Sequence, residues 1–85
     1  MQTFTHIIED PLGLHARPAA MLVKTISGYQ STITVKTPNG STDAKRLMAL
    51  MRLGAKQGTA LIFTVEGSDE ASAAESLKTF LKENL

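Results

Sequence analysis

The chain has 85 residues and a formal net charge of +1 at pH 7, with two histidines, no cysteine, one tyrosine and three phenylalanines. We expect residues 1–85 to form a single domain with a small core, because a chain of this length buries only about 60% of the surface that it exposes when unfolded. The absence of cysteine excludes disulfides and thiolate chemistry, and the two histidines and the spacing of the carboxylates do not form a ligand set for a metal. Nucleic-acid binding is not favoured, because it needs more positive charge and more aromatic rings.

The lack of a signal sequence and of a long apolar stretch predicts a cytoplasmic location. Met1 to His6 contains neither a basic region nor a long apolar run, and no stretch approaches the length of a transmembrane helix. We therefore expect a cytoplasmic protein that does not insert into a membrane. We also expect it to act as a monomer and to need no cofactor. Any chemistry takes place at the surface with a partner completing the site, because so small a core leaves no deep pocket.

The first predicted element is a strand from Thr3 to Ile8. Its alternation is irregular, because Phe4, His6 and Ile8 share one face while the apolar Ile7 falls on the other. His6 is therefore inward or at an edge, and its role is structural, since no glycine, helix start or arginine accompanies it. Asp10-Pro11-Leu12-Gly13 follows as a loop.

A helix is predicted from Ala16 to Ser27, with Gly28 ending it. Pro18 suits the first turn of a helix, where its missing amide is not needed, and Leu14 can pack against that turn. The residues expected to face the core are spaced as on one side of a helix: Ala19, Leu22, Val23 and Ile26.

His15 is placed just before this helix, at its positive end. The free amides of a helix start attract an anion there, and the Arg17 guanidinium is a planar set of donors that suits phosphate. An ordinary imidazole has a pKa of about 6.5, so near pH 7.5 one ring nitrogen has a free lone pair for nucleophilic attack. Considered alone, a histidine at a helix start is more often a capping or surface residue than a nucleophile.

A hairpin is predicted next. Ser31 to Thr37 alternates polar and apolar residues, Asn39-Gly40 is a strong signal for a tight turn, and Ser41 to Asp43 returns as a short strand at the sheet edge. A second helix is then expected from Ala44 to Leu53, capped by Thr42 or Asp43 and ended by Gly54.

This second helix has too many apolar residues for one buried face. At least one of Met48 and Met51 should face solvent, where an adaptable methionine suits a surface that docks several partners in turn. For each methionine taken singly, filling a gap in the core is about as good an interpretation.

The last two elements are a strand from Thr59 to Glu66 and a helix from Glu70 to Leu85, separated by Gly67-Ser68-Asp69, which ends the strand and caps the helix. The complete order, strand, helix, strand, strand, helix, strand, helix, predicts an α+β fold with helices packed on one face of an antiparallel sheet. The helix residues expected in the core are Ala73, Ala74, Leu77, Phe80 and Leu81.

The octapeptide from Gly13 to Ala20, GLHARPAA, resembles the active-site signature of the HPr family, the histidine-containing phosphocarrier proteins of the bacterial phosphoenolpyruvate-dependent phosphotransferase system. The resemblance extends through nearly the whole chain, including Gly28, Asn39-Gly40, Ala44-Lys45, Leu53-Gly54, Gln57-Gly58 and the last helix. It implies an open-faced two-layer sandwich, βαββαβα, with a four-stranded antiparallel sheet in the order 1-4-2-3.

The resemblance also implies a function, that of a phosphocarrier rather than an enzyme. Enzyme I phosphorylates His15 on Nδ1, the amides of Ala16 and Arg17 and the Arg17 side chain hold the phosphoryl oxygens, and a histidine of a sugar-specific enzyme IIA receives the group in sugar uptake. The family's partner-binding positions correspond here to Ala16, Ala20, Lys24, Leu47, Met48, Met51, Arg52 and Gly54.

One position departs from the family pattern. Many relatives have a serine at the start of the second helix that a regulatory kinase phosphorylates in some bacteria, and this chain has Arg46. Arginine does not accept that phosphate, so we predict no seryl regulation at this position. Two alternatives to sugar uptake stay open: a paralogue in a nitrogen-type or other regulatory branch, and an interaction module that binds a regulator without using His15.

Overall fold

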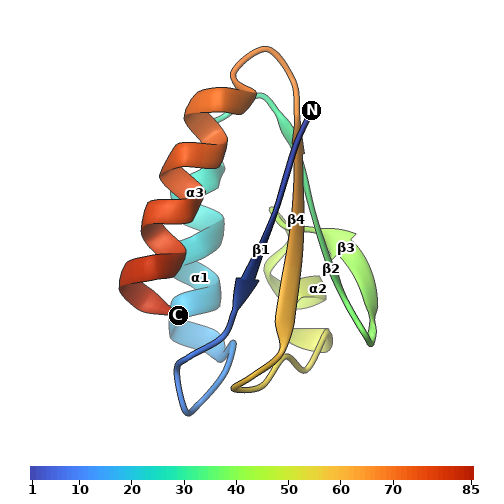
Figure 1. Ribbon diagram of the computed structural model, residues 1–85, viewed down its shortest axis with the longest axis vertical. Helices are drawn as coiled ribbons and strands as arrows, with labels where there is room; N and C mark the ends of the chain where they lie inside the picture. The colour runs from blue at the N-terminus through green and yellow to red at the C-terminus, as the bar shows by residue number, and fades with distance from the viewer.

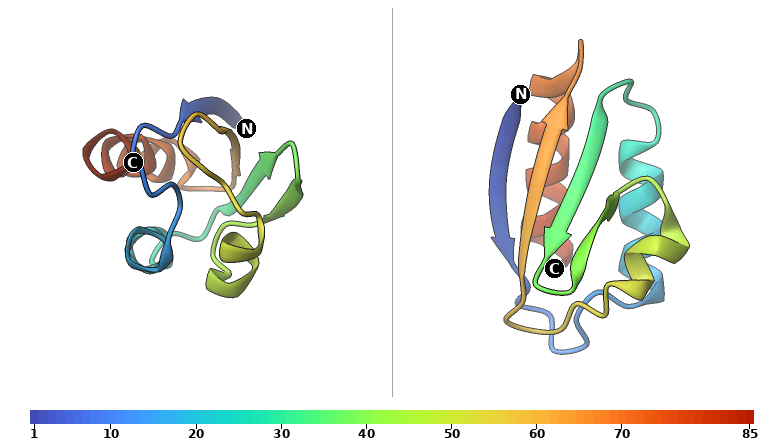
Figure 2. Two further views of the ribbon diagram at one scale, coloured as in Figure 1. Left: turned by 90° about the horizontal axis from the view of Figure 1, so that it is seen from below. Right: turned by 90° about the vertical axis from the view of Figure 1, so that its right-hand side faces the viewer.

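The computed structural model describes residues 1–85 as a four-stranded antiparallel sheet in the order β1-β4-β2-β3 with three helices on one face (Figures 1 and 2). This confirms the α+β class and the strand order that the family resemblance implies. The elements are β1 (Gln2–Ile7), α1 (Ala16–Ile26), β2 (Thr32–Thr37), β3 (Gly40–Asp43), α2 (Leu47–Arg52), β4 (Ala60–Glu66) and α3 (Glu70–Asn84). None of the three helices has the length and apolar character that crossing a membrane requires.

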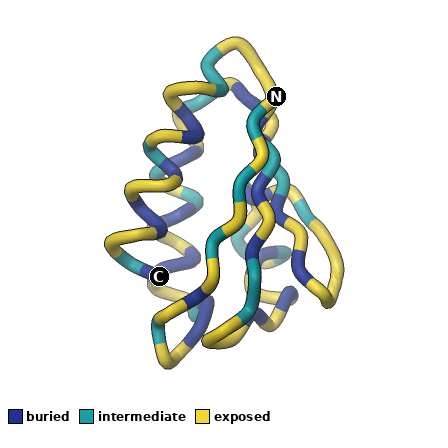
Figure 3. Tube along the Cα trace, in the orientation of Figure 1, coloured by how far each residue is buried: buried dark blue, intermediate teal, exposed yellow.

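Burial alternates from residue to residue along β1 and β4, as the colours in Figure 3 show, so successive side chains point to opposite faces of the sheet. In β1, Phe4 and His6 point inward and Ile7 outward, and the Phe4 ring stacks on the Phe63 ring of β4 with centroids 5.5 Å apart. The other face of the sheet is uncovered and carries five threonines, together with apolar and charged residues that include Ile7, Lys36, Ile62 and Glu66. His6 is thus inward, on an edge strand, with its Nε2 atom buried and without a hydrogen-bond partner.

The core lies between the sheet and the helices and contains 20 buried apolar residues. Removing these side chains from water is the main stabilising contribution to the fold. Of the four residues expected inward on α1, Ala19, Leu22 and Ile26 are buried and Val23 is partly exposed. The five residues expected inward on the last helix are all buried.

The predicted start of the second helix is wrong by three residues, because α2 begins at Leu47 with Arg46 at the N-cap. The Ala44 amide donates to the Ile33 carbonyl at 2.8 Å and so continues the pairing of the hairpin with β2. The Asp43 carboxylate accepts the Lys45 amide at 2.9 Å in a tight turn. Asp43 therefore caps a turn before the helix rather than the helix itself.

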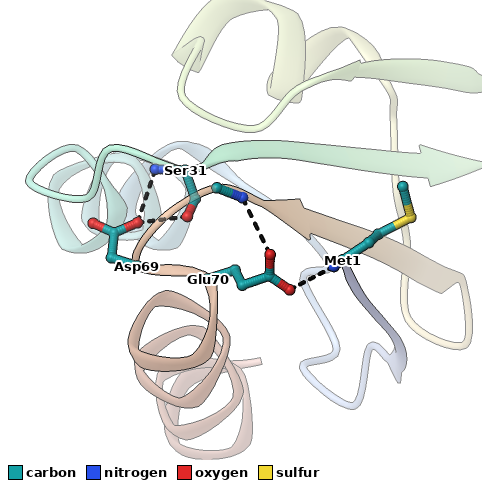
Figure 4. Close-up of polar contacts among 5 residues, drawn as sticks. Met1, Ser31, Asp69 and Glu70 are labelled. Carbon is teal, nitrogen blue, oxygen red and sulfur yellow. Dashed lines mark hydrogen bonds and ion pairs between the residues drawn. The ribbon is translucent and has the colours of Figure 1, made fainter.

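Asp69 is the N-cap residue of α3, but the prediction that its side chain caps the helix is wrong. Its carboxylate accepts hydrogen bonds from the Ser31 hydroxyl and the Ser31 amide (Figure 4). It also accepts the Gln30 amide, and these bonds join α3 to the start of β2. The hydrogen bond from the Ser31 hydroxyl, followed by that from the Gln30 amide, lowers the pKa of Asp69. The short connection between β4 and α3 is thus fixed by a charged residue to the start of β2, which lies beside the end of β4 in the sheet.

Glu70 makes a second polar link at the same end of the molecule. Its carboxylate lies 2.6 Å from the amino group of Met1 and accepts the Gly67 amide at 3.4 Å (Figure 4). The hydrogen bond from the Met1 amino group is the main cause of a lowered pKa for Glu70. Both links lie at the opposite end of α1 from His15, because Gln30 and Ser31 follow that helix.

Candidate functional site

His15 is the N-cap residue of α1, as the sequence predicts. Its backbone is extended, with φ −98° and ψ 179°, and its carbonyl accepts the Ala19 amide at 3.0 Å, the bond that begins the helix. The imidazole makes no capping hydrogen bond, and the side chain is 37% exposed. A ring in this position is free to react with a group that arrives from solvent.

The helix start beside His15 has unused donors. The amides of Ala16 and Arg17 donate to no acceptor in the chain, and both residues are exposed. Unpaired amides at the positive end of a helix dipole are an anion-binding arrangement. The exposed Arg17 side chain adds a guanidinium on the same side of the helix start.

The loop before α1 is fixed to the loop after α2, and this sets the position of His15. The Leu14 amide donates to the Ala55 carbonyl at 3.0 Å, and Leu14 is buried in the core. Gly13 has φ +69° and lies directly against the backbone of Ala55 and Lys56. A residue with a side chain at position 13 does not fit there, so glycine is needed both for its φ and for the close approach.

His15 and Arg17 line one open hollow of about 280 Å³ at the surface. Its other lining residues are Asp10, Pro18, Met21 and Asn84. Asp10, Met21 and Asn84 are not among the site residues predicted from the sequence. No sequence motif connects Asn84 with His15, because Asn84 comes from the far end of the chain. The Asp-Pro-x-Gly pattern at Asp10 is typical of a side chain that bonds to its own turn.

Asp10 is the only acidic residue of this hollow. Its Oδ1 accepts the Leu12 amide at 2.8 Å, and its Oδ2 lies 3.8 Å from Nε2 of His15. The carboxylate therefore faces one nitrogen of the imidazole ring at ion-pair distance, longer than a hydrogen bond.

The predicted partner-binding residues lie on α1, on α2 and just after α2, and these two helices pack against each other. We call this set the α1–α2 surface. Met48 is 66% exposed and Met51 is 40% exposed, so both methionines face solvent, while Leu47 is partly buried against the core. The remaining members are all exposed: Ala16, Ala20, Lys24, Arg52 and Gly54. Arg46, at the α2 N-cap, is also exposed.

Comparison with known proteins identifies relatives over nearly the whole chain. Residues 2–83 match the family model described as the PTS HPr component phosphorylation site. The phosphocarrier protein HPr of Lysinibacillus sphaericus is 41% identical over 83 residues, which are 98% of this chain and 94% of that protein.

Solved structures agree with this match. The crystal structure of HPr from Thermoanaerobacter tengcongensis superposes with a TM-score of 0.91 at 38% identity, covering 98% of this chain and 93% of that one. The Bacillus subtilis catabolite repression protein Crh, crystallised as an intertwined dimer with a swapped domain, has a TM-score of 0.77 at 30% identity, covering 94% of this chain and 92% of that one.

Proposed function

The chain belongs to the HPr family of phosphocarrier proteins, and we propose that it accepts a phosphoryl group from phospho-enzyme I on His15 and passes it to a histidine of an enzyme IIA. The observation that carries this proposal is the placement of His15: an exposed, uncapped imidazole next to two unpaired amides at the start of α1. In this role the protein is a stoichiometric intermediate in sugar uptake rather than an enzyme, and it acts in the cytoplasm as a monomer of one domain.

The chemistry follows from these positions. The lone pair of Nδ1 attacks phosphorus, the bond between phosphorus and the donor histidine breaks, and its electron pair returns to the donor ring. The amides of Ala16 and Arg17 and the Arg17 guanidinium bind the phosphoryl oxygens. Transfer to enzyme IIA is the same step in reverse, with His15 as the leaving group.

The open position of the site favours a carrier over a permanent acceptor. The end of a helix stabilises an anion at an exposed position by only about 0.3 to 1 kcal/mol. A phosphoryl group on His15 is thus held by weak interactions and stays available to the next protein. The partners dock in turn on the α1–α2 surface, where Met48 and Met51 adapt to different shapes.

A second candidate function is a regulatory one, in a nitrogen-type branch or as a binding module that does not use His15. The exposed methionines of α2 and the similarity to Crh favour it. Arg46 opposes the form of regulation that depends on a phosphorylated serine at the start of α2, so we propose that no such modification occurs there.

The test uses purified protein with enzyme I, magnesium and phosphoenolpyruvate, followed by addition of an enzyme IIA. We expect intact mass spectra to show one acid-labile phosphoryl group on the protein, which then moves to the enzyme IIA. If the protein accepted no phosphoryl group, the phosphocarrier function would be rejected in favour of the binding module that does not use His15. Acceptance followed by transfer only to a regulatory enzyme IIA, and to none that is sugar-specific, would identify the regulatory branch.

A further inference from the structure

The carboxylate of Asp10 is held in a fixed orientation beside the imidazole of His15. The Asp10 amide donates to the Leu85 carbonyl at 3.1 Å, and the Asp10 carbonyl accepts the Gly13 amide at 2.9 Å, so the backbone of the turn is fixed on both sides. Within the side chain, Oδ1 accepts the Leu12 amide at 2.8 Å. The remaining oxygen, Oδ2, is the one that lies 3.8 Å from Nε2 of His15.

We propose that Asp10 is a positioning residue for the phosphoryl transfer: it keeps the ring proton of His15 on Nε2 and so leaves Nδ1 as the nucleophile. This inference rests on the proposed phosphocarrier function. An ionised carboxylate carries no hydrogen, and its negative charge attracts an N–H dipole at this distance, so the ring nitrogen that faces it carries hydrogen. In a neutral imidazole the other nitrogen, Nδ1, then has the free lone pair.

The same carboxylate assists the step after attack. When Nδ1 forms its bond to phosphorus, Nε2 keeps its proton and the ring becomes positively charged. No proton leaves the ring, and the electron pair of the broken bond goes to the donor histidine. Asp10 stabilises the positive ring, as the buried aspartate of a Ser-His-Asp triad stabilises the imidazolium of its histidine. The two ring nitrogens are separated by a carbon atom, so the carboxylate faces the ring edge that does not carry phosphate.

Two variants separate this role from a purely structural one. In Asp10→Asn, the amide oxygen continues to accept the Leu12 amide, so the NH₂ group must face Nε2 of His15. That group is a donor, and it favours the tautomer with hydrogen on Nδ1, which has no lone pair for attack. In Asp10→Ala, both the charge and the turn hydrogen bond are lost, but nothing favours the wrong tautomer.

The proposed role and a purely structural role of Asp10 predict opposite orders for the phosphorylation rates of Asp10→Ala and Asp10→Asn. Phosphorylation by phospho-enzyme I should be about two- to fivefold slower in Asp10→Ala, the range for an exposed charge pair, and slower still in Asp10→Asn. If Asp10 only held the turn, Asp10→Asn would match the parent protein and Asp10→Ala would be the slower variant. Thermal unfolding of both variants provides the control for folding.

The tautomer itself is read from the ¹⁵N chemical shifts of the His15 ring in the unphosphorylated protein, which needs no partner. We expect hydrogen on Nε2 in the parent protein and a shift toward Nδ1 in Asp10→Asn. An unchanged tautomer in Asp10→Asn, or Asp10→Ala reacting more slowly than Asp10→Asn, would overturn the role of Asp10. Failure of the parent protein to accept a phosphoryl group would instead reject the phosphocarrier function, and the NMR comparison would still decide where the proton lies.

Discussion

Gly13 lies so close to Ala55 that a Cβ atom at position 13 would be 2.5 Å from the Ala55 carbonyl oxygen. The same carbonyl accepts the amide of Leu14, one residue before His15. The loop after α2 thus supports the loop that presents the histidine. This contact joins the proposed reactive residue to the end of the α1–α2 surface on which partners are proposed to dock.

Gly13→Ala should therefore destabilise the fold by about 1 to 3 kcal/mol, because alanine is strained at φ +69° and its methyl group meets backbone atoms. It should also slow phosphorylation, since relief of the clash displaces His15. Gly28→Ala is the matched control, because a Cβ there has no atom within 4 Å, and its stability should change by less than about 0.5 kcal/mol. Urea unfolding of both variants provides the measurement, and equal stabilities would show that the Gly13 contact is unimportant.

Replacing Arg17 should affect transfer far more than folding. The side chain is exposed and lines the hollow at His15. Arg17→Gln therefore removes the guanidinium that donates hydrogen bonds to the phosphoryl group and leaves the core unchanged. We expect about a tenfold slower phosphorylation with a stability change under about 0.5 kcal/mol. Lys82→Gln removes an exposed positive charge from α3 and should change neither quantity. If both variants slowed transfer equally, the slower transfer would be due to the change in net charge and not to loss of the hydrogen bonds from the Arg17 guanidinium.

The docking role of α2 predicts a change in KM. Met48→Ser removes the most exposed apolar side chain of that helix, and we expect KM for phosphorylation by enzyme I to rise about fivefold or more with kcat nearly unchanged. Ile7→Ser is the control, because Ile7 is 51% exposed on the uncovered face of the sheet. A rise in KM for the Ile7 variant and not for the Met48 variant would place docking on the sheet instead.

The link between Ser31 and Asp69 predicts acid-sensitive stability. The Ser31 hydroxyl, followed by the Gln30 amide, lowers the pKa of Asp69 in the folded state. Folding is therefore favoured above the ordinary aspartate pKa of about 3.9, and this contribution is lost as pH falls through the lower folded-state pKa. Ser31→Ala should be less stable than the parent at pH 7, with the difference shrinking toward pH 3. Urea unfolding at both pH values measures it, with Ser68→Ala, an exposed position, as the control; a difference independent of pH would contradict the linkage.

The fold and the placement of His15 were predictable because their signals are local. The spacing of apolar residues in α1 and the motif around Pro18 indicate the helix start directly, and the sheet order, taken from family resemblance, is confirmed. Asp43 and Asp69 were misjudged for one reason. Both look like helix caps in the sequence. The bond from the Ala44 amide to the Ile33 carbonyl extends the hairpin pairing past Asp43, and the Asp69 carboxylate bonds to Ser31 instead of to its own helix.

The composition of the hollow could be predicted only in part. His15 and Arg17 belong to one motif, whereas Asn84 reaches the hollow from the end of α3, 69 positions later in the chain than residue 15. Asp10 is near in sequence, yet its orientation depends on the hydrogen bonds to Leu12 and Leu85. The roles proposed for the α1–α2 surface stay predictions, because exposure alone does not identify a partner.

The most direct test of the phosphocarrier function compares the two histidines of the chain. His6 lies on the inner face of β1 with its Nε2 buried, whereas His15 is exposed at the start of α1. After incubation with enzyme I, magnesium and phosphoenolpyruvate, intact mass spectrometry should show one acid-labile phosphoryl group on the parent protein and on His6→Gln, and none on His15→Gln. A phosphoryl group on folded His15→Gln, or none on the parent protein, would contradict the function.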